Sequence, residues 1–194
     1  MPVIVKQKNY EDPNPIEGGT YHGVCIGVVD VGTQVSALYG AKRQIIITWE
    51  LPEVLGEDSK PRLQTHWYNM TLHDGSRLFI DLSAWRGKDF TSEELAGFDV
   101  CNIIGANCFL SIGIKPNGKP DVKSVSKLTK TTPKVEPVRP TFCHSIDESG
   151  FNFDEKVPDW QANVALGSEE HKASALDNYE PEAFDDVPAE GIPF

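Results

Sequence analysis

The segment RQIIITWELP at residues 43–52 alternates between apolar and polar side chains, and this alternation decides the fold. One face carries Ile45, Ile47, Trp49 and Leu51, and the other carries Gln44, Thr48 and Glu50. A period of two in a run rich in β-branched residues is typical of a strand with one buried face. We therefore predict a strand that ends at Pro52 and directs Trp49 into a core.

Four further segments alternate in the same way, at residues 20–32, 62–72, 107–115 and 121–130. In the first, TYHGVCIGVVDVG, one predicted face carries Val24, Ile26 and Val28, and the other carries Tyr21, Gly23, Cys25 and Gly27. Glycines inside a strand mark a bulge, a bend at a barrel corner or the close approach of a ligand. In the segment 62–72, the apolar set is Tyr68, Met70 and Leu72. This parity directs Trp67 outward.

The hydrophobic period changes between the third and fourth predicted strands. Helical spacing is carried by Leu78, Leu82 and Trp85. Asp74 or Ser76 can cap the start of this helix, and Gly87 ends it. Thr91 and Glu94 have the spacing of a capping box, which predicts a second short helix. Residues 33–42 are rich in turn formers and predict a loop, and PNGK at 116–119 predicts a hairpin turn.

This order of elements predicts a mainly β protein. Five strands with a helix between the third and the fourth are typical of an OB-fold, a small Greek-key barrel. We expect an N-terminal arm at residues 1–18 and an OB-fold nucleic-acid-binding domain at 19–130. We expect a Pro-containing linker with a short helix at 131–172. We expect residues 173–194 to form a disordered acidic tail that binds partner proteins.

The negative charge is concentrated in the C-terminal third. The whole chain has a formal net charge of −11 at pH 7. Residues 1–130 carry 14 Lys and Arg against 15 Asp and Glu, whereas residues 131–194 carry 4 against 14. Such asymmetry is expected of a folded body with an acidic tail. The acidic total therefore does not argue against nucleic-acid binding by the body.

Several classes of site are disfavoured by the sequence. Cys25, Cys101, Cys108 and Cys143 lack the paired spacing of a zinc site, so we expect reduced thiols and no metal. The chain has no phosphate-binding Walker loop, no nucleophile elbow and no H-E-x-x-H motif. We expect neither an enzyme nor a cofactor. The N-terminus resembles no signal peptide and no apolar run is long enough to span a membrane, so we expect a cytoplasmic protein.

Aromatic and cationic side chains gather on one side of the predicted barrel. Single strands are bound by stacking bases on aromatic rings while cations follow the phosphates. The aromatic candidates are Tyr21, Tyr39, Trp67 and Phe109. The cationic candidates are Lys42, Arg43, Lys115, Lys123, Lys127 and Lys130. Each has a structural alternative, since Tyr21 could close a barrel end and any lysine could be a solvated charge. Their combination favours nucleic-acid binding.

The chain resembles a family of bacteriophage single-stranded DNA-binding proteins. The segments KRQIIITWELPE, LSAWRGKDFTSEEL and NIIGANCFLSI are similar to that family over roughly residues 15–130. The tail matches the acidic, Ile-Pro-Phe-ending tails of this functional class at Asp185, Asp186, Ile192, Pro193 and Phe194. In this chain residues 187–191 separate the acids from the tip. The resemblance implies protection of single-stranded DNA in replication, recombination and repair, with partner proteins recruited by the tail.

Two other functions remain open from the sequence. The chain could bind RNA or serve as a general OB-fold adaptor, because contacts to the 2′-hydroxyl depend on geometry. It could also be a structural phage protein that binds no nucleic acid. Binding of duplex DNA is a further alternative that the sequence leaves open. If the chain is phage-encoded, we expect it in the host cytoplasm. A homo-oligomer, as a dimer or as a cooperative array on the strand, also remains open, and the sequence sets no number of subunits.

Overall fold

The computed structural model describes residues 14–177. The arm before residue 14 and the partner-binding residues of the expected tail lie outside this range. Those tail residues are Asp185, Asp186, Ile192, Pro193 and Phe194. The structure of the predicted acidic tip is therefore not described, and its role stays a prediction.

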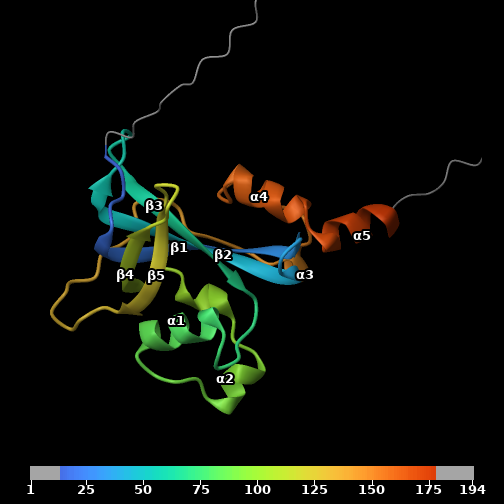
Figure 1. Ribbon diagram of the computed structural model, residues 1–194, viewed down its shortest axis with the longest axis horizontal. Coiled ribbons are helices and arrows are strands. Elements are labelled where there is room, and N and C mark those ends of the chain that lie inside the picture. The colour runs from blue at the N-terminus through green and yellow to red at the C-terminus, as the bar shows by residue number, and fades with distance from the viewer. Residues whose placement is uncertain (1–13, 178–194) are drawn as a thin grey trace, which may run out of the picture.

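The described chain is built on a six-stranded sheet (Figure 1). Its antiparallel strands are β1 (Gly19–Ser36), β2 (Gly40–Leu55), β3 (Pro61–Asn69), β4 (Asn107–Ile114) and β5 (Pro120–Lys127). They lie in the order β3-β2-β1-β4-β5, and the short strand β6 (Phe142–His144) pairs in parallel with β1. The mainly β class is confirmed. The predicted loop at 33–42 is wrong for most of its length, because β1 and β2 continue as a long hairpin to Ser36 and from Gly40.

The predicted helices between the third and fourth strands are present. These elements are α1 (Arg77–Arg86), α2 (Ser92–Ala96) and the 3-10 helix η1 (Val100–Ile103). The Ser76 hydroxyl accepts a hydrogen bond from the Phe79 N–H at 3.2 Å, and Gly87 ends α1 in the left-handed conformation. Thr91 and Glu94 form the predicted capping box at the start of α2.

The inner face of the sheet packs against α1. Ile45, Ile47, Trp49 and Leu51 are buried in this core, as their alternation predicts. Leu78, Leu82 and Trp85 meet them from α1. Both Trp49 and Trp85 are buried, with their ring centroids 6.0 Å apart. The helix thus supplies the apolar layer that covers the inner face.

A bulge in β1 overturns its predicted parity. The pairing with β2 shifts between Cys25 and Gly27. Cys25 and Val28 therefore face the inner core, whereas Ile26 faces the opposite side of the sheet. The grouping of Ile26 with Val28 was wrong, because one extra residue in a strand exchanges the faces beyond it.

The outer face of β1 and β2 carries a second apolar core. It consists of Ile26, Val29, Val31, Ile46, Phe142, Ile146, Val157 and Ala165. Figure 1 shows α4 (Asp159–Leu166) on the side of the sheet opposite α1. Gly27 leaves room for this layer, since a Cβ at that position would overlap the Phe142 ring. The close approach at Gly27 is thus made by the protein's own Phe142 side chain.

Residues 131–172 therefore differ from the expected linker. They contain β6, α3 (Ile146–Ser149), α4 and the start of α5 (Glu169–Asp177). The buried Glu50 carboxylate accepts hydrogen bonds from the N–H groups of Val138 and Arg139, each at 2.8 Å. Gln161 of α4 donates to the Thr48 hydroxyl at 3.0 Å. The segment is attached to β2 by hydrogen bonds as well as by apolar packing.

A disulfide also links this segment to the region around α1. Cys101 of η1 is bonded to Cys143 of β6, with Cα atoms 6.1 Å apart. The expectation of reduced thiols was wrong for this pair, which is brought together across 42 residues of chain. Cys25 and Cys108 are free and buried. Among residues 14–177, no helix has the length and apolar character needed to cross a membrane.

Candidate nucleic-acid interface

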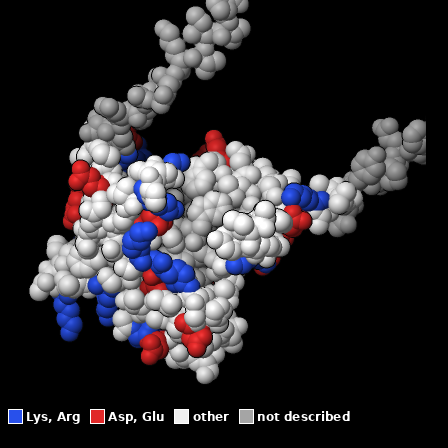
Figure 2. Space-filling model, in the orientation of Figure 1, with Lys and Arg blue, Asp and Glu red and all other residues white. Residues whose placement is uncertain are grey.

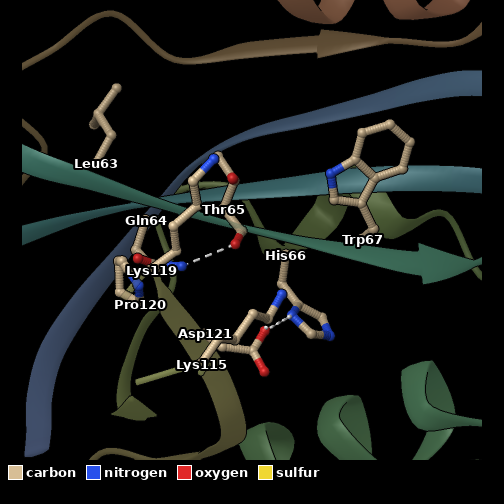
Figure 3. A pocket seen from close by; sticks show the side chains of 9 residues that line it. All are labelled: Leu63, Gln64, Thr65, His66, Trp67, Lys115, Lys119, Pro120 and Asp121. Atoms are coloured by element: carbon tan, nitrogen blue, oxygen red, sulfur yellow. Dashed lines mark hydrogen bonds and ion pairs between the residues drawn. The ribbon is translucent and has the colours of Figure 1, made fainter. Parts of the chain in front are cut away.

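A hollow lies between β3 and the end of the β4–β5 hairpin (Figure 3). Its volume is about 520 Å³. The lining residues are Leu63, Gln64, Thr65, His66, Trp67, Lys115, Lys119, Pro120 and Asp121. Two predicted site residues, Trp67 and Lys115, thus border the same hollow. The other lining residues come from consecutive positions of β3, from the hairpin turn and from the start of β5.

Strand parity places the Trp67 ring on the open side of β3. Trp67 is 40% exposed, whereas the next residue, Tyr68, is only 2% exposed. Figure 3 shows Trp67 and His66 on opposite sides of the β3 ribbon. The outward prediction for Trp67 is confirmed. Met70 lies beyond the end of β3 and is exposed, so its predicted place beside Tyr68 in the core was wrong.

The hairpin turn presents two lysines to this hollow. The Lys115 N–H donates to the Lys119 carbonyl at 2.8 Å and closes the predicted PNGK turn. Gly118 takes the left-handed conformation that such a turn requires, with φ 78°. Lys119 was absent from the predicted site, although its place in the turn was a usable signal. A turn that ends a hairpin on the rim of a groove directs its long side chains into solvent beside that groove.

Lys123 approaches the same place from β5. Its aliphatic stem lies over Gly113 of the neighbouring strand, where a Cβ would come within 2.7 Å of the Lys123 Cε. The Lys123 Nζ is 2.9 Å from the Asp121 carboxylate, and the Lys115 Nζ is 3.1 Å from it. Two cations from different positions on the hairpin therefore meet at one carboxylate. Figure 2 shows Lys and Arg side chains gathered over β5 and toward α1, with acidic side chains between them.

Asp121 and His66 join the two edges of this hollow. The His66 Nδ1 lies 3.8 Å from the Asp121 carboxylate. Burial acts to raise the pKa of Asp121, but the hydrogen bonds from Lys123 and Lys115 outweigh it and hold that pKa below its ordinary value. Burial, together with the positive charge of Arg77, lowers the pKa of His66. At neutral pH the hollow therefore contains an ionised carboxylate and a mostly neutral imidazole.

A smaller hollow lies at the loop between β1 and β2. Its volume is about 300 Å³ and its lining includes Tyr39, Lys42, Gln44 and Asn69. Tyr39 is 71% exposed, and the Lys42 Nζ lies 5.5 Å from the centre of its ring. Asn69 is on β3, two residues beyond Trp67. The two hollows thus follow one another along β3, which rises about 3.3 Å per residue.

Arg43 is engaged within the fold. It forms ion pairs of 2.6 Å with Asp30 and 2.8 Å with Asp147. Hydrogen bonds to both carboxylates raise the pKa of Arg43. Because Asp147 belongs to α3, this arginine connects the hairpin to the C-terminal layer. Its role here is structural, which the sequence pattern did not distinguish from a phosphate contact.

Four other predicted residues lie away from the two hollows on β3. Tyr21 packs against the inner core, and its hydroxyl donates to the Glu17 carbonyl at 3.0 Å. Phe109 is half-buried on β4 beside His22, with ring centroids 6.3 Å apart. Lys127 borders a different hollow, next to Trp85. Lys130 is exposed beyond the end of β5. The predicted set is thus divided among separate surfaces.

No protein-family model and no curated protein sequence matches the chain. The residues that the structure describes also contain no group of three or more His, Cys, Asp or Glu side chains arranged to hold a metal ion. The chemistry available along β3 is that of an exposed indole, an exposed phenol, amide groups and lysines. These groups can stack on flat rings and attract anions.

Proposed function

We propose that the protein binds single-stranded DNA along β3, from the loop between β1 and β2 to the hairpin turn between β4 and β5. The observation that carries the proposal is the exposed Trp67 ring between Lys42 at one end and Lys115 and Lys119 at the other. Stacking on an aromatic ring requires a base whose face is free, as in a single strand. Lysines on both sides can follow the phosphates of that strand.

The proposal includes assignment of the sheet to the OB-fold class. Three features support it: the strand order β3-β2-β1-β4-β5, the position of α1 between β3 and β4, and the approach of β3 to β5 at His66 and Asp121. In OB-folds the ligand lies across the second and third strands, between the loop joining strands one and two and the loop joining strands four and five. Tyr39 and Lys119 occupy those two loops here.

The C-terminal layer limits where the strand can lie. The outer face of β1 and β2 is covered by residues of β6 and α4, as the burial of Ile46 beside Trp67 illustrates. Trp67 itself stays open because β3 lies at the edge of this layer. The proposed path therefore runs along β3 and the hairpin turn, and does not cross the middle of the sheet.

Fluorescence anisotropy with labelled oligo(dT), a mixed-sequence duplex and oligo(U) at several salt concentrations tests the proposal. We expect oligo(dT) to bind most tightly and with little sequence preference. If the four lysines Lys42, Lys115, Lys119 and Lys123 each contact a phosphate, log K should fall with log salt with a slope of about −3, from about −0.7 per phosphate. Tighter binding of oligo(U) would favour the RNA function. Binding of none of the three would favour a structural role.

The wider role follows the sequence resemblance. We propose that the protein coats single strands during phage replication, recombination and repair, and that residues 178–194 recruit partner proteins. The support is the separation of charge, with 15 acids against 14 bases in residues 1–130 and the excess of acids beyond them. An acidic segment attracts basic partners without occupying the DNA site on the body. Capture of replication proteins by the full chain, and not by a chain that ends at residue 177, is the expected result.

A further inference from the structure

We infer that the space between Lys115 and Lys123 is a phosphate subsite, and that the Asp121 carboxylate occupies it when DNA is absent. The inference rests on the proposed function and names the group that regulates the affinity of the same site. The Lys115 Nζ lies 3.1 Å from the Asp121 Oδ1, and the Lys123 Nζ lies 2.9 Å from the Oδ2, so each lysine pairs with a different oxygen of one carboxylate. A phosphate presents the same chemistry, an anion with oxygen acceptors.

The burial of the three groups defines which of them a strand would reach first. The side chains of Lys115 and Lys123 are 48% and 53% exposed, whereas that of Asp121 is 17% exposed. The carboxylate lies below the two ammonium groups, which face solvent. A phosphate that arrives from solvent therefore meets the lysines and must compete with Asp121 for their hydrogen bonds.

Asp121 is the sole carboxylate among the described residues that line this hollow. Its negative charge offsets one of the positive charges of Lys115, Lys119 and Lys123. The lysine side chains of these two ion pairs are about half exposed, so water screens the pairs and each contributes little to stability. A phosphate can therefore replace the carboxylate at small cost. The arrangement holds the lysines in place but lowers the affinity for the strand. Weaker binding allows the strand to be released, as a protein that coats it transiently requires.

The Asp121→Asn variant of the full chain tests this inference, because it removes the charge and keeps an oxygen that accepts a hydrogen bond. With oligo(dT) at low salt, we expect about threefold to tenfold tighter binding than for the wild type. The salt slope should become steeper by about 0.7 for each phosphate newly paired. The matched control is Glu169→Gln, which removes the same charge from an exposed ion pair of 2.7 Å with Lys172 in α5. It should leave the affinity unchanged.

Thermal melting will show that both variants are folded, and Asp121→Ser serves as a second variant if the asparagine protein melts early. One outcome would overturn the subsite and leave the proposed function standing. In it, the Asp121 variants bind oligo(dT) no more tightly than the wild type, while Lys115→Ala binds it more weakly. An equal gain for Glu169→Gln would show an effect of net charge and would also overturn it. Loss of oligo(dT) binding by the wild type and every variant would remove both proposals.

Discussion

The two faces of the β1–β2 hairpin are both buried, but by different means. The inner face is apolar at alternate positions and packs against α1, which follows β3 closely in sequence. The outer face includes the polar residues Thr48 and Glu50, which are paired with groups 113 and 88 residues away along the chain. Apolar burial is stabilising wherever the surfaces fit, whereas a buried polar group must find its own partner. The inner face is therefore encoded locally and the outer face is not.

The largest effect should come from the inner face. Trp49 is fully buried, so Trp49→Ala should lower the free energy of unfolding by about 3–5 kcal/mol. Trp160→Ala is the matched control, because Trp160 of α4 is 45% exposed and should cost less than about 1 kcal/mol. Urea denaturation monitored by circular dichroism measures both values. An equal loss of unfolding free energy in the two variants would contradict the assignment of Trp49 to the core and of Trp160 to the surface.

A steric test applies to the outer face. Gly27→Ala places a Cβ where the Phe142 ring lies and should lower the free energy of unfolding by about 1–3 kcal/mol. Phe142→Ala in the same chain should recover part of this loss, which a double-mutant cycle measures as a coupling energy. Gly97→Ala is the control, because an added Cβ there would meet no atom within 4 Å. If Gly27→Ala lowers the free energy of unfolding no more than Gly97→Ala does, the C-terminal layer does not pack closely against β1 at Gly27.

The inner face shows how far sequence reasoning extends. Alternation in residues 43–52 correctly identified the residues of the inner core, although the opposite face, predicted to be open, is buried as well. The caps of Ser76, Thr91 and Gly87 correctly placed two helices. These signals depend on residues close to one another in the chain. The same reasoning failed in β1, where a bulge at Cys25–Gly27 exchanges the two faces. A bulge reflects the pairing with a neighbouring strand, which no window of local sequence contains.

The C-terminal layer was missed for a related reason. Residues 131–172 contain prolines and weak periodicity, which favoured a linker. Their structure depends on acceptors provided by β2, above all the Glu50 carboxylate that binds two successive N–H groups. Arg43 was misjudged for the same reason, since its partner Asp147 lies in this layer. Trp67 was placed correctly because β3 contains no bulge between Arg62 and Asn69.

A change at the exposed side of β3 should affect binding and leave stability unchanged. Trp67 lies at the edge of the outer layer, so Trp67→Ala should remove a stacking surface and leave both cores intact. We expect oligo(dT) binding to weaken by about 1–3 kcal/mol, roughly 5-fold to 150-fold, with little change in melting temperature. Met70→Ala, at another exposed apolar residue just beyond β3, is the control for lost apolar surface. Early melting of the Trp67 variant with unchanged DNA affinity would reverse our assignment.

The smallest effect should come from removing residues 178–194. This deletion distinguishes the role of these residues from that of the outer layer. Within residues 14–177, the apolar members of the outer core end at Ala165, and we therefore expect the deletion to change the free energy of unfolding by less than about 0.5 kcal/mol. It removes Glu180, Glu182, Asp185, Asp186 and Glu190 and no Lys or Arg. A tethered polyanion competes with DNA for the lysines beside β3 at high effective concentration.

The shortened chain should therefore bind oligo(dT) as tightly as the full chain or up to a few-fold more tightly. Any gain should disappear near 1 M salt, where charges interact over only about 3 Å. Anisotropy titrations of both chains across the same salt series make the comparison. Weaker binding after the deletion would place residues 178–194 within the DNA site, and the competition model would then be wrong. A loss of stability would instead assign them to the outer layer, whose required part we place at residues 138–166.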